Sequence, residues 1–308
     1  MRLFSVYFIV ISLILILPSS SFAIECINTR FLFDIKTGAN QPSDIAVDPK
    51  GNIYLVDGVN SRIIVVDGNG AWKFFLGTEG VAGTGKGQFK LPLGIDISAS
   101  GKVFIADTGN RRIQVFDTEG KFLYMFSVKS APGEPPAEPV DVAASKLNNY
   151  LYISDNNNHK IKVYKQNGTY DFEWGTFGED YGAFRYPAMM TLNEYNEILI
   201  VDVLNTRVQK FDPFGKFIVD IGSWGVLQGN LFRPKGVTID GKKRVLISDS
   251  YMGVIQAFTD LGQFRGVICE KNRMRKFKSP VGILVDKNDR LLVVEMRANM
   301  ITVLKILE

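Results

Sequence analysis

Short apolar runs separated by polar turns make up the chain after its first two dozen residues, and no helical period follows them. The most regular run is almost wholly apolar and ends at an acid, as in Ile53–Val56 before Asp57 and Val103–Ala106 before Asp107. Continuous apolarity is typical of a strand that is covered on both faces. An aromatic-rich run such as Phe122–Phe126 completes each unit. We therefore predict an all-β fold of four-stranded antiparallel units.

Two landmarks repeat in step along the chain. Prolines stand at residues 42, 92, 139, 187, 234 and 280, at intervals of 46 to 50 residues. Acids that end an apolar run keep the same period, at Asp57, Asp107, Asp155, Asp202, Asp249 and Glu295. A repeat of this length that cannot bury its own faces must stack on its neighbours. Residues 24–308 are thus predicted to form a six-bladed β-propeller, a monomeric ring with blades beginning near those prolines.

The two ends of the chain complement each other. The last repeat stops after its third strand, Ile301–Leu304, whereas Arg30–Ile35 resembles the fourth strands of other repeats. We expect this N-terminal strand, 30–35, to complete the sixth blade, because that pairing removes two open sheet edges.

The first 23 residues have the pattern of a secretory signal peptide. The apolar run covers residues 3–17, fewer than the roughly 20 residues that a membrane-spanning helix needs. We expect cleavage after Ala23 and export to the periplasm or the extracellular space; an uncleaved N-terminal anchor is the alternative. In an oxidising compartment Cys26 and Cys269 either form a disulfide or stay unpaired, and the sequence leaves both open.

A D-x-x-N-x-[RK] turn follows the apolar strand in the first four repeats. Asp and Asn can bond their own backbone in a tight turn, so we assign these residues a structural role, with the basic residue reaching a carboxylate across the blade boundary. With Pro92 upstream, the segment 105–117 closely resembles the NHL repeat; the fifth and sixth repeats depart from it at Met252 and Ala298. The turn residues are Asp57, Asp107, Asp155, Asp202, Asn60, Asn110, Asn158 and Asn205.

Basic and aromatic residues gather in the loops that a propeller places on one face. Removal of Arg2 with the leader lowers the net charge from +4 to +3, so the excess is small but concentrated. This face favours a non-catalytic binding or assembly scaffold for a protein, an anionic glycan or a lipid head group. Export argues against nucleic acid, and the chain has no C-x-x-C-H motif for covalent haem. The predicted face comprises Arg111, Arg112, Lys160, Arg185, Tyr186, Arg207, Trp224, Arg233, Arg273, Arg275, Lys276 and Lys278.

Catalysis is the alternative, because propellers that resemble this one include zinc-dependent amidating lyases and calcium-dependent lactonases. A three-histidine zinc site cannot be built from the single histidine, His159, and no nucleophile motif is present. Asp44, Asp96 and Asp141 stand near the starts of three first strands and could project into the channel. They would be the calcium ligands of a lactonase-like hydrolase or lyase; otherwise they cap strands or meet water.

Overall fold

The computed structural model describes residues 25–78 and 80–307, and in this part of the chain it contains strands and short 3-10 turns but no α-helix. Four separate antiparallel sheets of four strands follow one another along the chain, which confirms the all-β class and the four-stranded units. Their strands are β2 (Ile45–Val47), β3 (Ile53–Asp57), β4 (Arg62–Val66) and β5 (Trp72–Gly77); β6 (Gly94–Ile97), β7 (Val103–Asp107), β8 (Arg112–Phe116) and β9 (Phe122–Ser127); β10 (Pro139–Ala144), β11 (Tyr150–Asp155), β12 (Lys160–Lys165) and β13 (Tyr170–Trp174); and β14 (Pro187–Leu192), β15 (Ile198–Asp202), β16 (Arg207–Phe211) and β17 (Phe217–Ile221).

The remaining strands join in one sheet with the order β18-β19-β20-β21-β1-β25-β24-β23. A short strand, β22, pairs with β21 outside that path. The strands are β1 (Cys26–Ile35), β18 (Pro234–Ile239), β19 (Val245–Asp249), β20 (Val254–Phe258), β21 (Phe264–Glu270), β22 (Arg273–Met274), β23 (Pro280–Val285), β24 (Arg290–Glu295) and β25 (Met300–Ile306).

Strand β1 lies between the two halves of this sheet. It pairs antiparallel with β25 from Thr29 to Ile35 and parallel with β21 from Cys26 to Thr29. The strand is therefore longer than the expected 30–35, because its first residues find partners on the edge of β21 that the repeat pattern did not reveal.

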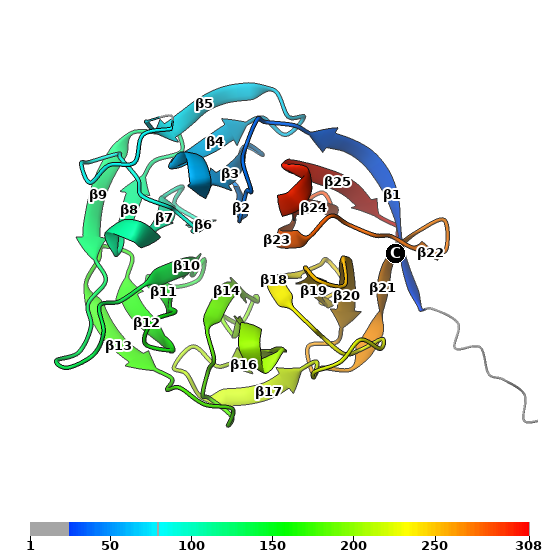
Figure 1. Ribbon diagram of the computed structural model, residues 1–308. Coiled ribbons are helices and arrows are strands. Elements are labelled where there is room, and N and C mark those ends of the chain that lie inside the picture. Colours follow the sequence, from blue (N-terminus) through cyan, green and yellow to red (C-terminus); the bar gives the residue numbers. More distant parts are fainter. Residues whose placement is uncertain (1–24, 79, 308) are drawn as a thin grey trace, which may run out of the picture.

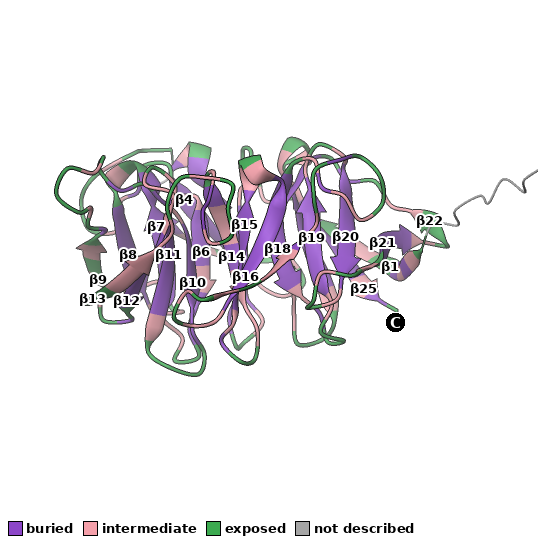
Figure 2. Cartoon of the chain, turned by 90° about the horizontal axis from the view of Figure 1, so that it is seen from below, coloured by how far each residue is buried: buried purple, intermediate pink, exposed green. Residues whose placement is uncertain are grey.

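The sheets stand around a central axis like the blades of a propeller (Figure 1). Strands β2, β6, β10, β14, β18 and β23 are innermost, and β5, β9, β13 and β17 lie on the rim. Seen from the side the molecule is a disc, with buried strands and exposed loops on both faces (Figure 2).

The hydrophobic core lies between neighbouring sheets. Every residue of β3, β7, β15 and β19 is buried, which is why these strands are apolar on both faces. Ile53 and Leu55 of β3 belong to one cluster with Leu292 of β24, so the first repeat packs against the last. Full burial of one such side chain stabilises a fold by roughly 1.5–3 kcal/mol.

A disulfide joins Cys26 of β1 to Cys269 of β21, with the two Cα atoms 5.4 Å apart. It fastens the start of β1 to a strand that lies 243 residues later in the sequence. The predicted leader, 1–23, lies outside the described residues. Within the described part of the chain, no helix is long and apolar enough to cross a membrane.

Candidate functional site

The acid at the end of each second strand holds the preceding linker in place. Asp57 accepts a 2.9 Å hydrogen bond from the backbone N–H of Asn40, and Asp107 accepts one of 2.8 Å from that of Lys90. The equivalent acids of the other repeats each accept a hydrogen bond from the backbone N–H of the residue 17 positions earlier. These acids are Asp155, Asp202, Asp249 and Glu295. The turn asparagines Asn60, Asn110, Asn158 and Asn205 donate to the same carboxylates.

The basic residue of this turn acts inside its own repeat. Arg112 Nε lies 2.7 Å from Asp107 Oδ2, and its other nitrogens donate to linker carbonyls such as Gly85 O. Arg207 does the same with Asp202 and the carbonyl of Asp180. Our expectation of a contact across the blade boundary is thus wrong, because the linker brings enough acceptors to the arginine locally. Arg112 and Arg207 are 8% exposed and cannot form part of a free basic face.

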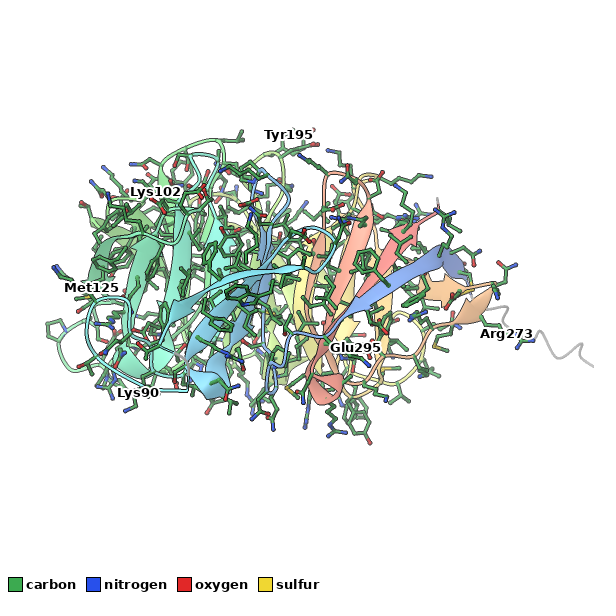
Figure 3. All side chains as sticks on the ribbon, turned by 90° about the horizontal axis from the view of Figure 1, so that it is seen from above. Lys90, Lys102, Met125, Tyr195, Arg273 and Glu295 are labelled. Carbon is green, nitrogen blue, oxygen red and sulfur yellow. A yellow bond between two sulfur atoms is a disulfide. The ribbon has the colours of Figure 1, made fainter. Side chains whose placement is uncertain are left out.

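Other members of the predicted basic face are also engaged. Lys160 forms ion pairs with Glu134 and Glu173, Arg185 with Glu179, and Arg275 with Glu270. Lys276 donates to the carbonyl of Met252. Arg273 lies at the outer rim of the disc, on β22, while Lys90 and Glu295 lie toward one face (Figure 3). The remaining exposed residues are Arg111, Tyr186, Trp224, Arg233 and Lys278.

A cavity of about 330 Å³ occupies the central channel. Asp44, Asp96 and Asp141 line it, so the sequence placed these acids correctly at the inner strands. Residues of the loop after β14, among them Asn193 and Glu194, extend the cavity toward the face on which Figure 3 shows Tyr195. Its walls are both polar and aliphatic; successive inner strands contribute the aliphatic side chains Ile45, Ile95, Val142, Met190, Val237 and Ile283.

The three acids also connect neighbouring sheets, a role that sequence reasoning missed. Asp44 Oδ2 accepts a 3.0 Å hydrogen bond from Ile95 N, and Asp96 Oδ2 accepts one of 2.8 Å from Ala144 N. Asp141 Oδ2 accepts one of 2.7 Å from Met190 N. Each carboxyl therefore joins its inner strand to the next one, and one oxygen of each group is already committed to a backbone amide.

Asp141 has a buried oxygen without a hydrogen-bond partner. This atom, Oδ1, lies where a side chain on Gly94 would stand, since a Cβ at that position would be 2.3 Å away. The glycine in β6 therefore makes room for the carboxyl. A buried polar atom in this situation is costly unless it acquires a proton or a ligand.

Burial changes the acidity of all three groups. Burial raises the pKa of Asp44 to about 7, and the charge of Asp96 acts in the same direction. Burial and the charge of Asp44 raise the pKa of Asp141 well above its ordinary value. Burial also raises the pKa of Asp96, although the Lys146 ammonium opposes this shift. The protonation of Asp141 therefore depends on the charge of Asp44.

The acids do not fit the expected calcium site. Among the described residues, no group of three or more His, Cys, Asp or Glu side chains is arranged to hold a metal ion. Calcium requires several ionised or carbonyl oxygens, whereas burial raises the pKa of these three carboxyls, and each uses one oxygen to accept a hydrogen bond from a backbone N–H.

The family comparison identifies NHL repeats in this chain: the family model described as NHL repeat matches residues 40–66 and 89–116. This confirms the resemblance inferred from the turn motif. No curated protein matches the chain significantly in sequence.

Several solved propellers are similar in fold. A streptogramin B lyase structure has a TM-score of 0.64 at 14% identity and covers 90% of this chain and 98% of that chain. A catalytically inactive virginiamycin B lyase from Staphylococcus aureus with quinupristin has a TM-score of 0.62 at 14% identity, covering 88% and 82%. Kuenenia stuttgartiensis hydrazine synthase has a TM-score of 0.62 at 11% identity, covering 88% and 97%.

These similarities correct the functional prediction. The expected non-catalytic binding or assembly scaffold is wrong, because the similar propellers are lyases and a synthase. The prediction failed because the sequence does not show which of the basic loop residues already have partners within the protein. In the structure Arg112, Arg207 and Lys160 are used to hold linkers and ion-pair partners.

Proposed function

We propose that this chain is a catalytic propeller that cleaves its substrate by elimination or hydrolysis at the carboxyl pair Asp44 and Asp141. The observation that carries the proposal is two adjacent carboxyls with raised pKa that line a cavity of about 330 Å³ with polar and aliphatic walls. Cavities in which polar groups of shifted pKa converge are typical of active sites.

The two carboxyls suit complementary roles. With its pKa at about 7, Asp44 is partly ionised at neutral pH and can accept a proton. Burial and the charge of Asp44 raise the pKa of Asp141, so that its carboxyl can hold a proton and deliver it to a leaving group. Elimination needs such a base and acid, while hydrolysis needs the base to activate water. The aliphatic side chains from Ile45 to Ile283 can contact an apolar part of the substrate, and Lys146, Asn193 and Thr238 can contact a polar part.

The test uses Asp44→Asn and Asp141→Asn, with Asp117→Asn in an exposed turn as the matched control. Quinupristin and a set of aryl esters and lactones are the probes, and products are followed by mass spectrometry. A lyase opens a ring without a change in mass, whereas a hydrolase adds one water. We expect at least a ~100-fold loss of rate in both channel variants and none in the control. Conversion of no probe, or equal rates in all variants, contradicts the proposal.

We also propose a ring of six blades in which β1 completes the last one. Two observations support this arrangement. Strand β1 pairs antiparallel with β25, and the nine-stranded sheet consists of two series of strands, one that starts from β18 at one end and one that starts from β23 at the other. The parallel contact of β1 with β21 then joins the fifth and sixth blades. Deletion of residues 30–35 should leave an insoluble chain, and a soluble, equally heat-resistant product would contradict this arrangement.

Export is part of the same proposal. The leader pattern at residues 1–23 and the disulfide between Cys26 and Cys269 are both consistent with an oxidising compartment outside the cytosol. The intact mass of protein recovered from the periplasm or medium should correspond to a chain that begins at Ile24. Recovery of the full-length chain from membranes would instead support an N-terminal anchor.

A further inference from the structure

A second cavity opens at the other end of the channel. Its volume is about 670 Å³, and it lies at the turns that follow the second strands. The residue directly after each repeat proline contributes to it: Ser43, Leu93, Val140, Ala188, Lys235 and Val281. Among these six residues Lys235 is charged, whereas the equivalent residues of the other repeats have small or apolar side chains.

The wall of this cavity carries positive charge without any acid. Arg233 and Arg297 join Lys235, and its other lining residues are apolar or neutral. Within the described chain none of these three side chains has a hydrogen-bond or ion-pair partner, whereas Arg62, Arg112 and Arg207 are all paired with aspartates. Burial and the nearby charge of Arg233 lower the pKa of Lys235. Cations crowded in this way are stabilised by an anion.

The rest of the cavity is apolar. Leu93, Met189, Leu204 and Met296 provide aliphatic and thioether surface, and Tyr251 adds an exposed ring. Ser250 and Ser279 can supply neutral hydrogen bonds at the edge. A ligand that fits this lining carries an anionic head for the three cations and an apolar body for the opposite wall.

We propose that this cavity binds a small organic carboxylate with an apolar group, held by Arg233, Lys235 and Arg297. The site is distinct from the carboxyl pair, since Asp44 and Asp141 line the cavity on the other side of the channel. Guanidinium groups bind carboxylates by paired charge-assisted hydrogen bonds, so Arg233 and Arg297 would hold the head group while the apolar wall contacts the rest of the ligand.

Calorimetric titration with 3-phenylpropionate at pH 7 and low salt tests the proposal, with 3-phenylpropionamide and inorganic phosphate as comparison probes. We expect the carboxylate to bind and the neutral amide to bind at least tenfold more weakly. Raising the salt concentration should weaken carboxylate binding, because the interaction is between charges.

The matched variants are Arg233→Gln with Arg297→Gln, and, as control, Lys121→Gln with Lys216→Gln on exposed turns elsewhere. Both pairs remove two positive charges. We expect the first pair to weaken binding by about 10- to 100-fold for each lost contact and the control pair to leave it unchanged. Lys235→Met should weaken it by a similar factor, with the melting temperature confirming that each variant is folded.

Three results would overturn the site: equal binding of the carboxylate and its amide, equal weakening by the two variant pairs, or phosphate binding as tightly as 3-phenylpropionate. The last would mean that the apolar wall has no part in recognition. Asp141→Asn separates this site from the proposed active site, because it should lower the rate of turnover at least ~100-fold and leave carboxylate binding intact.

Discussion

Asp107 Oδ1 accepts a 2.8 Å hydrogen bond from the backbone N–H of Lys90, which lies 17 residues earlier in the chain. The same carboxylate contacts Arg112 Nε at 2.7 Å and Gln114 Nε2 at 3.0 Å. One buried acid thus holds the incoming linker, the turn and the third strand together, and Asp202 does the same with Arg185 N, Arg207 and Gln209.

Asp107→Asn should therefore destabilise the protein by about 3 kcal/mol, because it leaves the buried Arg112 guanidinium without its counter-charge. Chemical denaturation measures the change in the free energy of unfolding. Asp117→Asn is the control: Asp117 accepts only backbone N–H groups in an exposed turn, so an effect below about 0.5 kcal/mol is expected. Equal losses in the two variants would show that the charge of Asp107 is not used.

Reduction of the disulfide should lower the melting temperature. The bond between Cys26 and Cys269 spans 243 residues, and closing such a long loop in the unfolded chain contributes roughly 2–5 kcal/mol. The double variant Cys26→Ser with Cys269→Ser should melt at the temperature of the reduced wild type and show no response to reductant. If reductant leaves the wild-type melting temperature unchanged, the bond does not contribute in solution.

The channel acids should make the protein less stable as pH rises. The pKa of Asp44 is raised from 3.8 to about 7, so between these pH values the folded state keeps a proton that the unfolded state has lost. The free energy of unfolding then falls by up to ~1.4 kcal/mol per pH unit for each such group. Asp44→Asn, which mimics the neutral form, should flatten this slope and melt higher than wild type at pH 8. A slope identical to that of wild type would mean that Asp44 is ionised when buried.

Calcium should leave the melting temperature unchanged at millimolar concentration. The carboxyls of Asp44, Asp96 and Asp141 each hold a backbone amide, and none of the described acids is arranged with others as a metal site. A ligand that bound only the folded state would raise the melting temperature in proportion to its occupancy. A clear rise with calcium but not with magnesium would restore the lactonase-like alternative.

Much of the architecture could be predicted because it is encoded locally. The period of the prolines and acids predicted the inner strands, and the aromatic-rich strand expected at Phe122–Phe126 is observed as β9, Phe122–Ser127. The bounds of β1 could not be predicted, because its first residues pair with β21, which the repeat does not indicate. Lys235 can be recognised in the sequence as a cation at a position where the other repeats have small or apolar residues. That Arg297 lines the same cavity could not be predicted, because the two residues come together only in the folded protein.

The sequence by itself determined the repeat, the strand order within each unit and the acids of the turns, since these depend on residues a few positions apart. Only the tertiary structure decided which charges are free. Arg112 and Arg233 are both arginines and look alike in the sequence. In the structure the linker surrounds Arg112 with hydrogen-bond acceptors, whereas Arg233 lies at a channel mouth without an acceptor. Burial likewise gave Asp44 its altered acidity, because desolvation depends on the sheets that enclose a carboxyl and not on the residues beside it in the chain.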